Sequence, residues 1–133
     1  MGVLPTAKIP DRGPFRLVDI FLLLDRRLDA DDKKTVLEMT PVELHMGLGK
    51  WVRNNARLWT DGVDLVVEDV MRLKDTYPVP YLEQFGAPGT VGIDDQGVDN
   101  SLLHPDNISS VVIVLYKQWL SDVLTADHLK VLE

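Results

Sequence analysis

The start of one long helix is the sequence feature that most constrains how this chain can fold. Thr40, Pro41 and Glu43 match a capping box: the threonine caps the first turn, proline takes the first helical position and the glutamate reaches back to the cap. Beyond them, apolar side chains recur three and four residues apart, at Leu44, Leu48, Trp51, Val52 and Trp59. This spacing predicts an amphipathic helix from residue 41 to about residue 59.

Two shorter helices are predicted before this one. Pro14 opens the first, and the apolar residues of 15–28 occupy almost every angle of the helix, which predicts burial on several sides. Asp29 or Asp31 can cap the second, over 32–39, with acids in the first turn where the helix dipole favours them.

Two more helices are predicted in the second half of the chain. Residues 63–77 have helical periodicity, and Pro105 behind a cap at His104 begins the last helix. Residues 1–13 are predicted to be an extended lead-in, and residues 86–101 to be a loop rich in glycine and acid.

The last helix carries more apolar residues than one face needs. Its inner stripe is Ile108, Val111, Val112, Leu115, Tyr116, Trp119 and Val123. Ile113, Val114 and Leu120 lie outside that stripe, so the helix is either central or presents a second apolar face to a partner. A buried strand over 111–115 is an alternative because the run is β-branched, but the caps and the later periodicity favour a helix.

Composition and length set the fold class. The chain has 133 residues, of which 45% are apolar and 26% charged, so it is predicted to be a single globular domain over 1–133. The helical segments predict an all-α fold, a compact bundle of about four to five helices with the glycine- and aspartate-rich loop before the C-terminal helix. The sequence contains no cysteine, which excludes disulfides and thiolate chemistry.

The charge balance bears on partners and location. Twenty-one acids against fourteen bases give a formal net charge of −7, which disfavours nucleic acid and favours encounter with a basic protein, although acidity also simply keeps domains soluble. The apolar run at residues 20–24 is too short to span a bilayer, and no secretory pattern is evident at the start. We therefore expect a cytoplasmic protein without a membrane partner.

The residues around the long helix are the candidates for chemistry or ligand binding. Two glycines, Gly47 and Gly49, lie inside it, which suggests that another helix or a ligand approaches the backbone closely. The candidate cluster for a ligand site or a structural contact is His45, Arg53, Asn54, His104 and Asp106. A core histidine and a capped helix start account for the same residues, so no catalytic residue is assigned and a non-enzyme is favoured.

The sequence predicts no metal site and no cofactor. The three histidines lack a two-ligand spacing on one helix. Asp94, Asp95 and Asp99 do not follow the alternate spacing of a calcium loop, and no glutamate closes the set. We predict a solvated loop there, whose acids are candidates for contact with a partner.

Two blocks of this sequence resemble a bacterial domain family of unknown function. The first block, residues 44–59, is similar to the pattern L-H-x-G-L-G-x-W-I-R-N-x-x-x-L-W, with Val52 in place of isoleucine. The second, from His104, is similar to H-P-D-D-x-S-x-x-I, with Asn107 in place of the second aspartate. The resemblance covers about half of the chain and implies that the two blocks pack together, without naming a reaction or a substrate.

These features favour a binding function. The leading hypothesis is a small acidic protein-binding module, such as an immunity protein that neutralises a toxin, with a basic protein as partner. Its candidate contact residues are Ile113, Val114 and Leu120 on the last helix and Asp94, Asp95 and Asp99 in the loop. Two alternatives stay open: a small-ligand binder or enzyme between the two blocks, and a self-associating subunit.

Overall fold

The computed structural model describes residues 15–55, 63–80 and 105–132, and the described residues are helical without strands. The all-α prediction is therefore confirmed. The lead-in over 1–13 and the loop over 86–101 lie outside the described residues, as do Asp94, Asp95 and Asp99.

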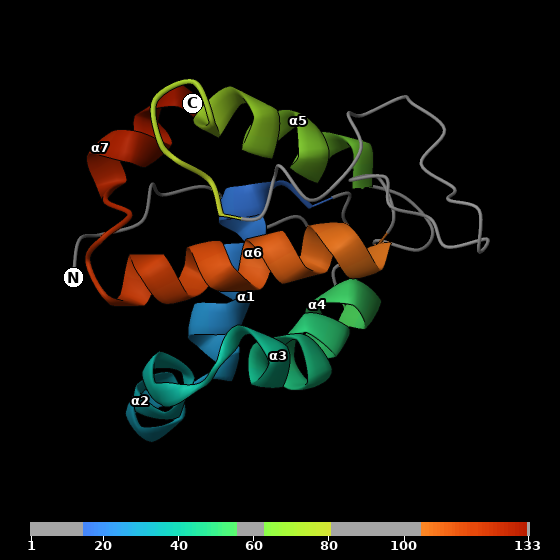
Figure 1. Ribbon diagram of the computed structural model, residues 1–133, viewed down its shortest axis with the longest axis vertical. Helices are drawn as coiled ribbons and strands as arrows, with labels where there is room; N and C mark the ends of the chain where they lie inside the picture. Colours follow the sequence, from blue (N-terminus) through green and yellow to red (C-terminus); the bar gives the residue numbers. More distant parts are fainter. Residues whose placement is uncertain (1–14, 56–62, 81–104, 133) are drawn as a thin grey trace.

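The helix that begins at Pro105, α6 (Pro105–Leu120), is the centre of the molecule. It crosses the middle of Figure 1, with α5 (Val63–Leu73) on one side and α3 (Pro41–Leu44) and α4 (Lys50–Asn55) on the other. None of its described side chains, over 107–120, is exposed. Its apolar residues face several of the other helices, whereas the half-buried residues follow one face, at Asn107, Ser110, Val114, Lys117 and Gln118.

The burial of α6 corrects the prediction that Ile113 and Leu120 contact a partner, because neither side chain lies on the surface. Ile113 is 1% exposed and Leu120 is 5% exposed, and both belong to the core of the chain itself. Val114 is half-buried. Of the two alternatives for this helix, the central one holds, because the chain's own helices cover the apolar residues outside the stripe. The strand over 111–115 is not formed, since these residues lie within α6.

The first two helices form close to their predicted ranges, α1 starting at Leu17, three residues after Pro14, and α2 two residues before the predicted start. Helix α1 (Leu17–Arg27) buries Leu17, Ile20, Phe21 and Leu24. Helix α2 (Ala30–Glu38) begins at the cap Asp29, whose side chain accepts a hydrogen bond from the Asp32 N–H at 2.8 Å.

The Thr40 capping box is also present. The Glu43 N–H donates to Thr40 Oγ1 at 3.3 Å, and the Thr40 N–H donates to Glu43 Oε1 at 3.1 Å. The helix that it opens is not a regular α-helix, because α3 and α4 are joined by a π-helical turn, η1 (His45–Gly49). The wide turn inserts a residue, so the buried positions step from Leu44 to Gly49 and then to Val52. Leu48 of the predicted stripe is half-buried and packs against the core, and the wide turn adds Gly49 as a fully buried position.

The end of α6 differs from the predicted one as well. The chain leaves the helix at Leu120, and Asp122 takes a left-handed conformation with φ 60°. The Val123 N–H then donates to Gln118 O at 2.9 Å, so the chain turns back and Val123 is 56% exposed. Leu124, fully buried, takes the core position predicted for Val123. Two short elements not predicted from the sequence follow, α7 (Ala126–Leu129) and the 3-10 turn η3 (Lys130–Leu132).

Replacement of the cap tests the start of the α3–η1–α4 segment. We expect Thr40→Ala to lower the free energy of unfolding by about 1 kcal/mol, because the Glu43 N–H loses its side-chain acceptor. Urea unfolding measures the change. The matched control is Thr35→Ala, an exposed threonine within α2. A Thr40→Ala protein as stable as this control would contradict the capping role.

Candidate functional site

The two blocks that resemble the domain family lie against each other. The turn η1 and helix α4 both pack against α6, which carries the second block. His45 begins η1, Asn54 lies near the end of α4 and Asp106 lies in the first turn of α6. The structure thus brings into contact segments that are about 50 residues apart in the sequence, which is the packing that the resemblance implied.

The side chains of the candidate cluster are described only in part. Asn54 is exposed to solvent. The side chains of His45, Arg53 and Asp106, and the whole of His104, lie outside the described residues. The structure therefore brings together the elements that carry four of these residues, and a shared site for their side chains stays a prediction.

The two glycines of the first block have different environments. Gly49 is buried in the helix that packs against α6, as expected for a glycine at a close helix contact. Gly47 is exposed, and a Cβ added to it would meet no described atom within 4 Å. Its φ is not in the left-handed region either. The expectation that each glycine marks a close approach within the chain is therefore wrong for Gly47.

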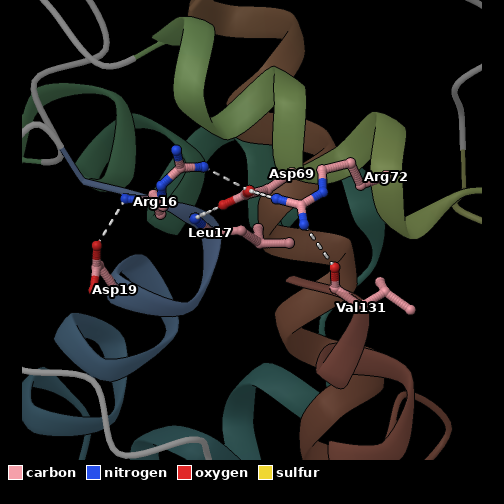
Figure 2. A network of polar contacts seen from close by, with 6 residues as sticks. All are labelled: Arg16, Leu17, Asp19, Asp69, Arg72 and Val131. Carbon is pink, nitrogen blue, oxygen red and sulfur yellow. Dashed lines mark hydrogen bonds and ion pairs between the residues drawn. The ribbon is translucent and has the colours of Figure 1, made fainter. Parts of the chain in front are cut away.

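The most convergent polar cluster in the described part of the chain surrounds Asp69 (Figure 2). Asp69 lies on α5 and is 1% exposed. Its Oδ1 accepts a hydrogen bond from Arg16 Nη1 at 2.9 Å, and its Oδ2 accepts one from the Leu17 N–H at 3.2 Å. Arg72 Nη1 lies 4.0 Å from the same carboxylate, and Arg72 Nη2 donates to Val131 O at 3.0 Å.

This cluster is a clasp between three parts of the chain. Asp69 joins α5 to the start of α1, and Arg72 extends the contact to the C-terminal turn η3. Burial raises the pKa of Asp69, and the Leu17 N–H and the Arg16 guanidinium partly offset this rise. Both carboxylate oxygens of Asp69 accept hydrogen bonds from the start of α1, and these bonds fix α1 against α5. We therefore assign Asp69 a structural role.

The sequence contained a signal for this clasp that the helical pattern alone did not reveal. Asp69 is an acid within the apolar stripe of α5, between Val66 and Val70 and four residues before Leu73. An acid at such a position must find partners because an unpaired buried charge is costly. Its partner Arg16, 53 residues away, could not be identified from local spacing.

A second polar contact joins α1, α2 and α6. The Tyr116 hydroxyl donates to Asp25 Oδ1 at 2.5 Å, and Lys33 Nζ lies 3.5 Å from the same oxygen. Burial, followed by the contact with Asp25, raises the pKa of Tyr116, so its hydroxyl is a donor rather than a base at neutral pH. Lys117 Nζ also donates to Met39 O at 2.6 Å, which fixes the end of α2 on α6.

The described residues offer no assembled metal site and no membrane span. They contain no group of three or more histidine, aspartate or glutamate side chains able to hold a metal ion. None of the helices in the described ranges is both long and apolar enough to cross a membrane. His128 accepts a hydrogen bond from the Thr125 N–H at 3.0 Å and packs beside Tyr77, its ring centre 4.8 Å from the tyrosine ring. Its surroundings are therefore those of a helix cap.

No family model, curated protein or solved structure matches this chain. The resemblance of its two blocks to a bacterial domain family accordingly stays a prediction.

Removal of the Asp69 charge tests the clasp. We expect Asp69→Asn to lower the free energy of unfolding by about 1.5–3 kcal/mol, because buried hydrogen bonds to a charged group are lost. Urea unfolding at pH 7 measures the loss. Asp64→Asn, the same change at an exposed position of α5, is the control and should have little effect.

The same pair of proteins tests the direction of the pKa change. Because the pKa of Asp69 is raised above its ordinary value of 3.8, the folded protein binds this proton more readily than the unfolded chain. Protonation of Asp69 therefore contributes stability that is fully present below pH 3.8 and is lost as the pH rises through the raised pKa. The stability difference between the native protein and Asp69→Asn should thus grow as pH is lowered from 7 toward about 4. If this stability difference instead shrinks as the pH is lowered, the effect of the ion pair with Arg16 on the pKa of Asp69 is larger than the effect of burial.

Substitution of Gly47 tests whether this chain needs a glycine there. The Cβ of alanine has space, and alanine favours a helix, so Gly47→Ala should raise the free energy of unfolding by about 0.5–1 kcal/mol. Thermal and urea unfolding of the dilute protein measure the gain. A loss of stability would show that the chain itself requires the glycine.

Proposed function

We propose that this chain is a small acidic module that binds a basic partner protein and, in the manner of an immunity protein bound to its toxin, neutralises or positions it. The observation that carries the proposal is the exposure of helix α2. This helix buries only one of its side chains, that of Val36. A helix that adds so little to the core leaves most of its surface available to a partner.

The charges on α2 suit a basic partner. The three carboxylates of α2 and that of its cap are all exposed, at Asp31, Asp32, Glu38 and Asp29. Of its two lysines, Lys33 faces Asp25 in an ion pair at 3.5 Å, so part of the positive charge is turned toward the chain. The helix therefore presents an excess of negative charge, in line with the net charge of −7.

The position and apolar content of α2 also support a contact. Leu37 is 39% exposed on this helix, which supplies an apolar group beside the acids. In Figure 1, α2 lies at one end of the molecule, opposite the end formed by α5 and α7. A partner could thus cover α2 without disturbing α5 or the clasp at Asp69.

Charge reversal on α2 tests the proposal. The native protein, Asp31→Lys with Glu38→Lys, and a control with Asp64→Lys and Glu68→Lys on α5 are each used to capture proteins from the source lysate. Both double variants change the net charge equally at exposed positions. We expect one basic protein to bind the native and control forms, and its association with the α2 variant to be slower by roughly tenfold or more at low salt.

Two results would count against this function. Capture of the same protein by all three forms, with equal association rates, would show that the acids of α2 do not guide binding. Absence of any captured protein would remove the support for a binding module. Circular dichroism of each variant first establishes that it is folded.

A further inference from the structure

The outward face of the α3–η1–α4 segment exposes a methionine and a glycine, Met46 and Gly47, that the fold of this chain does not explain. Among the side chains of this segment that the structure describes, the exposed ones are Glu43, Met46, Gly47, Lys50 and Asn54. The described part of the chain exposes only three large apolar side chains, and Met46, at 57%, is the most exposed of them. The adjacent Gly47 leaves open space where a side chain would fit. The protruding Met46 thus lies next to an exposed position that has no side chain.

The order of these residues is self-complementary. Glu43 precedes Met46 by three residues, and Lys50 follows Gly47 by three. If two such helices cross antiparallel about a two-fold axis between Met46 and Gly47, each methionine lies over the glycine of the other copy. The same operation places each Glu43 opposite a Lys50. A contact of this kind uses one surface patch twice, as two-fold dimers do.

We infer that this face is a homodimer contact, in which Met46 of each copy fills the space over Gly47 of the second copy and Glu43 pairs with Lys50. An unbranched thioether adapts well to an irregular gap, and a glycine at a crossing point lets two backbones approach closely. Opposite charges at the rim fix the antiparallel direction, because a parallel arrangement would place like charges together.

The charges of this face favour a second copy over a basic partner. Glu43 stays ionised, since hydrogen bonds from Thr40 lower its pKa. With Lys50 it gives the described exposed residues of this face one charge of each sign, whereas α2 carries the excess of acid. The inference therefore does not depend on the proposed function. One helix face buries less than the roughly 1,200 Å² of stable interfaces, so the dimer should be weak.

The oligomeric state in solution tests this contact. Sedimentation equilibrium of the native chain, from about 10 μM to 1 mM in about 0.15 M salt, should show a monomer–dimer equilibrium. Lys50→Glu should weaken dimerisation at least tenfold because acids then face each other across the contact. Gly47→Leu should do the same because the added side chain occupies the space that receives Met46.

Matched controls separate these effects from general changes in charge or hydrophobicity. Lys74→Glu makes the same charge change at an exposed position after α5, and Thr35→Leu adds the same kind of side chain to an exposed position of α2. Both should dimerise as the native protein does. Circular dichroism establishes that each variant is folded.

A mixing experiment tests the antiparallel pairing directly. Glu43→Lys and Lys50→Glu should each be largely monomeric alone, because each places like charges opposite one another. An equimolar mixture restores two opposite-charge pairs and should form a heterodimer with an affinity within about threefold of the native dimer. A native chain that stays monomeric throughout the range overturns the inference. It is also overturned by a dimer that Gly47→Leu and Lys50→Glu leave intact, or by failure of the mixture to associate.

Discussion

The need to bury most of the surface of α6 organises this molecule. Its side chains include Tyr116 and Trp119, and none of those described is exposed, so one neighbouring helix could not bury them. The chain meets this requirement with α5 on one side and the α3–η1–α4 segment on the other, while Phe21 of α1 meets Tyr116 edge to face at 5.5 Å between ring centres. Burial of each such large apolar side chain contributes about 1.5–3 kcal/mol to stability.

Polar contacts fix the positions of the helices that cover α6. The Asp69 clasp ties α1, α5 and the C-terminal turn together, and the Asp25–Tyr116 contact ties α1 to α6. These bonds add direction to a core whose apolar contacts are largely non-directional. Together they leave α2 and the outer face of the α3–η1–α4 segment as the regions least used by the chain itself. The proposed surface for a basic partner and the proposed homodimer contact lie in those two regions.

The π-helical turn connects the packing of the core with the exposed face. By adding one residue to the turn, η1 brings Gly49 to a buried position next to Leu48, which is half-buried against the core. The same shift leaves Met46 and Gly47 together on the outside. Turns of this type are rare and frequently occur at functional sites, because the extra residue alters which groups a helix presents. In this chain it separates a buried glycine, Gly49, from an exposed one, Gly47.

The sequence by itself determined the helices whose signals are local. The caps at Asp29 and Thr40 and the apolar stripe of α6 depend on residues within one or two turns, and the structure confirms them. Tertiary structure decided the rest: the shift at η1, the early end of α6 at Leu120, and the pairing of Arg16 with Asp69. It also decided that Ile113 and Leu120 are buried rather than offered to a partner. Local spacing cannot settle such choices, because each depends on which distant segment supplies the covering surface or the opposite charge.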